Sequence, residues 1–130
     1  MKPEPVLSDE APRPIGPYSQ AVRAGEVIFL SGQLGIDPLT GRLAEGIEAQ
    51  AVQALRNIRA VLASAGCSMS DLVTTTVLLA DMGDFAAVNR VYSEFFTEPF
   101  PARAAYQVAA LPLGARVEIQ ATAFSGGGNG

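Results

Sequence analysis

One amphipathic segment, residues 45–65, limits how this chain can fold. Apolar residues recur in it every three or four positions, at Ile47, Ala51, Leu55, Ile58 and Leu62. Gly66 follows where a glycine commonly ends a helix. A helix with a single apolar stripe has to bury that stripe against another layer. We therefore expect a long helix that lies across a β-sheet.

Extended segments on both sides of this helix supply the strands of the sheet. Residues 15–23 lead through a short turn at Ala24-Gly25-Glu26 into the apolar strand Val27–Leu30, which ends at Ser31-Gly32-Gln33. Residues 72–79 are rich in β-branched side chains, which is typical of a buried strand. Residues 116–124 alternate apolar and polar side chains, which predicts a strand with one buried face.

A second helix and one more strand complete the predicted order. Asp81 stands at a capping position, the helix after it places Phe85, Val88 and Tyr92 toward the core, and it ends before Pro99. A residue before proline is driven out of the helical region, so a new extended run begins after Pro101. The order β-β-α-β-α-β-β predicts an α+β fold, with a mixed sheet and two helices packed on one face.

The domain limits follow from composition. Residues 1–14 contain four prolines and several charges, which predicts a flexible N-terminal arm. Residues 15–124 form a single predicted domain, a length sufficient to bury a core. Residues 125–130 are rich in glycine and are expected to be a disordered tail.

Charge and residue usage argue against several functional classes. The chain has 9 basic and 13 acidic residues, a net charge of -4, and its basic residues are scattered, whereas nucleic-acid binding normally needs a concentrated positive face. There is no histidine, which excludes Ser-His and Cys-His catalysis and the usual zinc sites. Cys67 is the single cysteine, so it forms no internal disulfide, and we interpret it as a structural thiol. No apolar run is long enough to span a membrane and the first residues lack a signal peptide's apolar core, so we expect a cytoplasmic protein.

Arg103 is the first candidate for a binding residue. It follows Pro101 and lies between Ala102 and Ala104, two small residues that offer it little surface to pack against. Its planar guanidinium suits a carboxylate or a phosphate bound through two parallel hydrogen bonds. The alternative is an ion pair with an acidic residue of its own or a neighbouring subunit, and the residue by itself leaves both interpretations open.

Alternation along the last two strands predicts where Arg103 lies. If Tyr106 and Val108 pack under the helices, Arg103 shares the opposite face of the sheet with Glu118. That face is small and polar, which suits contact with another subunit around a cleft. Gly32 could offer a bare backbone N–H to a ligand there. Asn89 lies beside the core stripe of the second helix. Two interpretations of it stay open: a functional residue, or a polar side chain that forms its hydrogen bonds with a nearby backbone group.

Several motifs in a fixed order resemble the RidA family of reactive intermediate deaminases, also called YjgF-like proteins. The resemblance extends from about Ala11 to Phe124. It is carried by Ile15-Gly16-Pro17-Tyr18-Ser19-Gln20-Ala21, Ser31-Gly32-Gln33, Asp37-Pro38-x-Thr40-Gly41, Gln50 with Asn57, Asp84-Phe85 with Val88-Asn89 and Tyr92, Pro101-Ala102-Arg103, and Leu111-Pro112 through Val117-Glu118-Ile119. Any one of these segments is a weak signal, whereas all of them in this order are highly specific.

The resemblance implies a fold like that of chorismate mutase and a homotrimer with sites in the clefts between subunits. It implies hydrolysis of 2-imino acids and their enamine tautomers, such as 2-aminoacrylate, 2-iminopropanoate and 2-iminobutanoate, to 2-keto acids and ammonia, with no cofactor and no metal. By the same resemblance Arg103 anchors the substrate carboxylate and Glu118 orients the attacking water. The remaining implied site residues are Tyr18, Ser31, Gly32, Asn89 and Ala105.

Two departures and one alternative stay open. Ala105 stands where many family members have cysteine, and the connection Thr97-Glu98-Pro99-Phe100 looks shorter than in familiar members, which puts substrate preference in doubt. A regulatory protein that binds a 2-keto or amino acid without turnover would use the same anchor. Members of the family have also been called ribonucleases or translation inhibitors, and the acidic charge of this chain argues against that activity.

Overall fold

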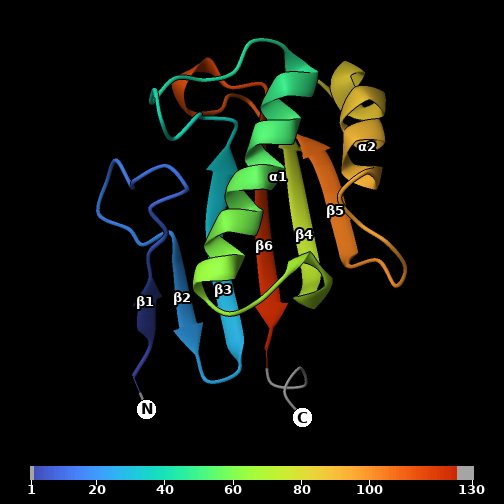
Figure 1. Ribbon diagram of the computed structural model, residues 1–130. Helices are drawn as coiled ribbons and strands as arrows, with labels where there is room; N and C mark the ends of the chain where they lie inside the picture. Colours follow the sequence, from blue (N-terminus) through green and yellow to red (C-terminus); the bar gives the residue numbers. More distant parts are fainter. Residues whose placement is uncertain (1, 126–130) are drawn as a thin grey trace.

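The computed structural model describes residues 2–125, which form one mixed β-sheet with two α-helices on one of its faces (Figure 1). The strands are β1 Glu4–Val6, β2 Ala21–Ala24, β3 Val27–Leu34, β4 Leu72–Leu79, β5 Ala102–Gln107 and β6 Val117–Phe124. The helices are α1 Ile47–Ser64 and α2 Phe85–Ser93, and short 3₁₀ turns occupy Met69–Asp71, Met82–Asp84 and Pro112–Gly114.

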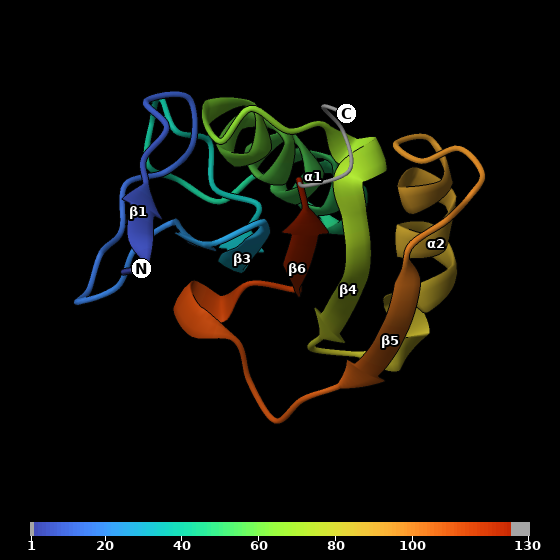
Figure 2. The same cartoon turned by 90° about the horizontal axis from the view of Figure 1, so that it is seen from below.

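The sheet has the strand order β1-β2-β3-β6-β4-β5. β4 and β5 are parallel, because α2 crosses back between them, and the other neighbours are antiparallel. Seen from below, α1 and α2 lie on the same side of the sheet, and neither covers the opposite face (Figure 2). The predicted α+β class and the placement of both helices on one face are therefore confirmed. No helix within residues 2–125 is long and apolar enough to cross a membrane.

The N-terminal arm differs from the prediction. Residues 4–6 add the strand β1 to the edge of the sheet, and Ser8 and Ala11 are buried. The cause is Gln20, a buried residue whose amide nitrogen donates to the carbonyl oxygens of Ser8 and Pro12 and whose side-chain oxygen accepts from the Ser8 amide. The side chain of Gln20 thus forms hydrogen bonds with backbone groups of a proline-rich segment. Because of these bonds, residues 4–12 are not a loose arm. Most of the predicted tail, residues 126–130, lies outside the described residues.

The core is formed where the stripe of α1 meets β3 and β6. Leu55, Ile58 and Leu62 are fully buried, and so are Val117 and Ile119 of β6. The alternation predicted for the last strand is confirmed: Val117, Ile119, Ala121 and Ala123 are buried toward the helices, and the residues between them are more exposed. Burial of a large aliphatic side chain stabilises a fold by about 1.5–3 kcal/mol, so this contact accounts for the position of α1.

Polar contacts hold α1 against the end of β3. The Asn57 amide nitrogen donates to the carbonyl oxygens of Leu34 and Ile36 at 3.1 and 2.9 Å. The backbones themselves approach closely at Gly35, where an added Cβ would lie 2.4 Å from the Gln50 carbonyl oxygen and 2.6 Å from its Cα. Gly35 is therefore required by the spacing between the helix and the sheet.

We predict that Gly35→Ala destabilises the protein by about 2–3 kcal/mol, because the added methyl meets backbone atoms that move only if α1 shifts. The midpoint of thermal unfolding should fall by roughly 10 °C. Gly16→Ala is the matched control, since its added Cβ would make an ordinary 3.6 Å contact with the Tyr18 ring. Calorimetry that showed the same midpoint for both variants would contradict this interpretation of Gly35.

Candidate active site

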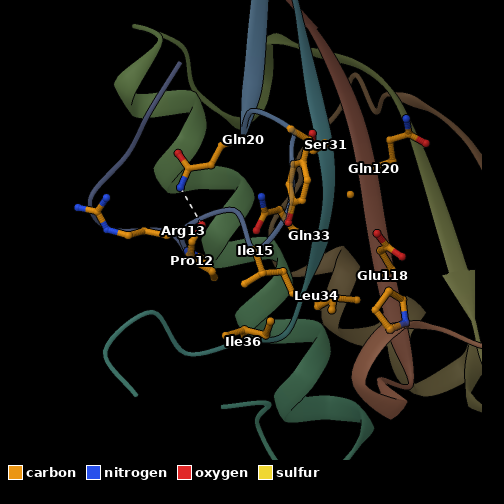
Figure 3. Close-up of a pocket in the computed structure, with 13 residues that line it drawn as sticks. Pro12, Arg13, Ile15, Gln20, Ser31, Gln33, Leu34, Ile36, Glu118 and Gln120 are labelled. Atoms are coloured by element: carbon orange, nitrogen blue, oxygen red, sulfur yellow. Dashed lines mark hydrogen bonds between the residues drawn. The ribbon is translucent and has the colours of Figure 1, made fainter. Parts of the chain in front are cut away.

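A cavity of about 450 Å³ opens on the sheet face that the helices leave uncovered. Residues of the Ile15–Gln20 segment, of β3 and of β6 line it (Figure 3). Pro112 of the last 3₁₀ turn also lines the cavity. Four of the residues predicted for the site lie here together, namely Tyr18, Ser31, Gly32 and Glu118. Their side chains and backbones come from segments far apart in the sequence, so the sheet brings them together.

A β-bulge in β3 determines how Ser31 and Gly32 face this cavity. Leu30 pairs with Ala121 and Gln33 pairs with Ile119, so two residues of β3 stand opposite the single residue Gln120 of β6. A bulge of this kind bends its strand and redirects side chains. The strand continues past the end that the sequence predicted, and Ser31, Gly32 and the buried Gln33 all line the cavity.

Hydrogen bonds define the donor and acceptor state of Ser31. Its hydroxyl donates to the carbonyl oxygen of Ser19 at 2.6 Å, and its backbone amide donates to the carbonyl oxygen of Gln20 at 2.9 Å. With its proton engaged, the hydroxyl oxygen faces the cavity as an acceptor. It therefore suits a substrate N–H better than a substrate carboxylate.

Glu118 is the half-buried carboxylate of the cavity (Figure 3). Burial raises the pKa of Glu118 above the ordinary value, because the charged form loses part of its hydration. The other ionisable side chains that line the cavity are Arg13, which extends away from Glu118, and Tyr18 (Figure 3). A carboxylate with a raised pKa accepts a proton more readily near neutral pH than an ordinary glutamate does.

Arg103 lies elsewhere, against α2. Its Nη1 donates to Asn89 Oδ1 at 2.7 Å, and its guanidinium carbon lies 4.8 Å from the centre of the Tyr92 ring and 5.4 Å from that of Phe85. Both aromatic rings are within the range of cation–π attraction. Arg103 itself is exposed, so the cluster holds the guanidinium in place and leaves it open to a ligand.

Thr75 completes the support beneath Arg103. The hydroxyls of Thr75 and Tyr92 are 2.7 Å apart and hydrogen-bonded, and both residues are buried. Thr75 is also the register partner of Arg103 across β4 and β5. Ala105, two residues along β5, packs on the same side against the core. Arg103, Asn89 and Ala105 thus form a second cluster on the helix side of the sheet.

The prediction that Arg103 and Glu118 share a face is wrong for a single chain. Arg103 lies on the helix face with Thr75, whereas Glu118 lines the cavity on the opposite face. Tyr106, which we expected under the helices, is 51% exposed. The assignment failed because each face of β5 carries alanine together with long side chains that are polar or amphipathic, so its pattern fits either orientation. The aromatic contacts with α2 decide it.

Several residues of the two clusters could not be recognised as site residues from the sequence. Tyr92 and Phe85 fit a core stripe, and Thr75 fits a buried strand, so their contacts with Arg103 emerge only from the fold. Leu34, Ile36 and Pro112 also line the cavity, and they too are brought there only by the fold. No spacing rule would have selected them.

The fold and the two clusters define a small α+β protein with a carboxylate in a cavity and an arginine on another surface, both suited to a small polar ligand. A family model described as Endoribonuclease L-PSP matches residues 8–125, which is nearly the whole chain. Together with the relatives described next, this match shows that the chain belongs to the RidA family.

Three relatives illustrate the similarity. A 2-iminobutanoate/2-iminopropanoate deaminase from Capra hircus is 57% identical over 122 residues, which cover 93% of this chain and 89% of the relative. The crystal structure of RidA from an Antarctic Psychrobacter species has a TM-score of 0.92 at 48% identity and covers 93% of this chain and 98% of that one. The structure of TdcF from E. coli, which contains bound serine, has a TM-score of 0.90 at 39% identity, with coverage of 93% and 98%.

Proposed function

We propose that this protein hydrolyses reactive 2-imino acids, such as 2-iminopropanoate and 2-iminobutanoate, to 2-keto acids and ammonia. The observation that carries the proposal is the half-buried Glu118 in a cavity that also holds Tyr18, Ser31 and Gly32. The goat relative, whose name describes this activity, supports the same conclusion at 57% identity. The single cysteine suits a reducing compartment, so a cytoplasmic location is part of the proposal.

The chemistry needs few groups, because an iminium carbon is already electrophilic. Glu118 accepts a proton from a water molecule as the water oxygen bonds to the imine carbon, which gives a carbinolamine. Glu118 then gives this proton to the amine nitrogen and takes the proton of the new hydroxyl group, so that the C–N bond breaks, ammonia leaves and the carbonyl forms. The acceptor oxygen of Ser31 binds an N–H of the reacting group and so fixes the orientation of the imine.

Arg103 supplies the carboxylate anchor in this proposal. Asn89 occupies one edge of its guanidinium, and the rings of Phe85 and Tyr92 restrict its motion, so little entropy is lost when it binds an anion. Because Arg103 and Glu118 lie on opposite faces of one sheet, a single chain does not bring anchor and base to one substrate. The proposal therefore requires two chains at each site, with Glu118 from one and Arg103 from the other.

A homotrimer meets this requirement, since a cyclic assembly joins two different surfaces of neighbouring copies and closes on itself. The uncovered sheet face supports it, because Phe29, Val73 and Phe124 are about half exposed there or at its edge. Exposed apolar groups of this size commonly mark contact surfaces. We propose that this face forms the interior of the trimer.

We predict a trimer by light scattering coupled to size-exclusion chromatography. The expected mass is three times 13.5 kDa across micromolar concentrations. The charged substitution Phe29→Glu should dissociate the trimer and abolish deamination, because it places a carboxylate in the proposed interface. Ala63→Glu is the control and should leave the trimer intact, because Ala63 is exposed at the end of α1. Val52 on the same helix is only partly exposed and is therefore less suitable. An active monomer would contradict the two-chain site.

One coupled assay tests the activity directly. A serine or threonine dehydratase generates the imine, and keto-acid formation is followed with and without this protein, corrected for spontaneous hydrolysis. Acceleration proportional to protein concentration is the expected result. A regulatory protein that binds an amino acid is the second candidate, supported by the serine bound to TdcF. Binding of 2-ketobutyrate with no acceleration of imine loss would favour that candidate.

A further inference from the structure

The carboxylate of Glu118 occupies the space that a side chain at position 32 would fill. A Cβ built on Gly32 would lie 2.2 Å from Oε2 of Glu118, 2.9 Å from Cδ and 3.1 Å from Cγ. Non-bonded carbon and oxygen atoms do not approach to 2.2 Å, so any residue larger than glycine is incompatible with this position of Glu118. The bulge in β3 creates the contact, because it brings Gly32 to the cavity face beside Glu118.

Backbone conformation does not explain the glycine at position 32. Glycine is usually required where φ is positive, as it is at Gly25, Gly41 and Gly66. Gly32 is not among the residues with positive φ, so alanine would fit its backbone without strain. Gly35 differs as well, since its added Cβ would meet the backbone of α1 rather than a side chain of the cavity. Space for the carboxylate is the remaining requirement.

We infer that Gly32 is a positioning residue for Glu118: its missing side chain lets the carboxylate lie against β3, at the place where it acts on the attacking water. This inference rests on the proposed deaminase function, and it assigns Gly32 a role beyond that of a backbone donor. In Gly32→Ala the new methyl displaces the carboxylate toward solvent. The base is then still present, but its distance and direction to the imine carbon are wrong.

The first experiment is a double-mutant cycle on imine hydrolysis. Gly32→Ala should lower kcat by about 10- to 100-fold, because a misplaced base loses most of its contribution to proton transfer. In a Glu118→Gln background, which already lacks the base, Gly32→Ala should change kcat less than about threefold. An equal loss in both backgrounds would overturn the inference, since it would show that Gly32 acts on the substrate or the fold independently of Glu118. Full activity in Gly32→Ala would overturn it too.

The second experiment does not depend on turnover. In protein labelled with ¹³C at glutamate carboxyl carbons, NMR titration follows Glu118, whose resonance is assigned by its loss in Glu118→Gln. In Gly32→Ala the pKa of Glu118 should fall toward the ordinary glutamate value, because the displaced carboxylate regains hydration. A raised pKa retained in the variant would overturn the inference. If neither protein accelerates imine loss but the titration shifts, the positional role of Gly32 stands and the proposed function fails.

Gly16→Ala is the matched control for both experiments. Gly16 also lies in the segment leading into the cavity, but its added Cβ would only touch the Tyr18 ring at 3.6 Å. It should leave the titration of Glu118 unchanged. Light scattering and thermal unfolding on each variant separate displacement of Glu118 from loss of the assembly. A Gly32→Ala protein that dissociates or unfolds at the assay temperature would contradict the local role assigned to Gly32.

Discussion

Replacing Glu118 with glutamine is expected to lower the rate of imine hydrolysis by about 10² or more, while binding of 2-ketobutyrate changes little or improves slightly. Glutamine keeps the shape of glutamate and its capacity for hydrogen bonds, but it loses the basic carboxylate that takes the proton from water in the proposed mechanism. In the proposed site Arg103 holds the keto acid, and removal of a negative charge from the site favours an anion.

Two measurements on the same preparation test this prediction. Calorimetric titration with 2-ketobutyrate measures binding, and dehydratase-coupled release of keto acid measures turnover. Glu94→Gln, at the exposed end of α2, is the control for removal of a surface carboxylate and should affect neither. Loss of both binding and turnover would indicate a structural Glu118, and loss of neither would reject its catalytic role.

The raised pKa of Glu118 also predicts the pH dependence of the unmodified protein. The base acts in its ionised form, and burial disfavours that form. As pH decreases, turnover should therefore fall at a higher pH than an ordinary glutamate would produce. This decrease should be absent from the residual activity of Glu118→Gln, which has no group to protonate at that position.

Replacing Arg103 with lysine is the second large effect that we expect. Lysine keeps the charge but not the planar pair of parallel N–H donors, and it does not reproduce the stacking over Tyr92 and Phe85. The loss of charge-assisted bonding is on the order of 2–3 kcal/mol, which corresponds to roughly a 30- to 150-fold decrease in kcat/KM. Binding of 2-ketobutyrate should weaken in parallel, because the proposed anchor role applies to the carboxylate of substrate and product alike.

Arg90→Lys is the matched control for this prediction. Arg90 lies next to Asn89 on α2, where it pairs with Glu48 at the surface, and exposed pairs of this kind contribute little. It should retain normal kinetics. Near-normal kinetics in Arg103→Lys itself would show that Arg103 serves the fold or an interface rather than the substrate.

The elements of this fold were predictable because their patterns are local. The stripe of residues 45–65 predicts α1, and the β-branched run Leu72–Leu79 coincides with β4. The alternation of residues 116–124 correctly assigned both faces of β6, because its apolar and polar residues differ clearly in burial cost. Composition also restricted the chemistry, since a chain without histidine has no imidazole for proton transfer and leaves this task to groups such as carboxylates.

Long-range contacts decided what these patterns left open. The orientation of β5 was mispredicted because its small side chains bury similarly on either face, and the contacts of Arg103 with Asn89 and Tyr92 settle it. The conformation of residues 4–12 depends on Gln20, whose amide nitrogen donates hydrogen bonds to carbonyl groups eight and more positions away. The bulge opposite Gln120 adds one residue to β3, and no local propensity predicts such an insertion. The sequence determined the elements and the available chemical groups, and the tertiary structure alone decided which of them share a surface, because that depends on contacts between segments distant in the chain.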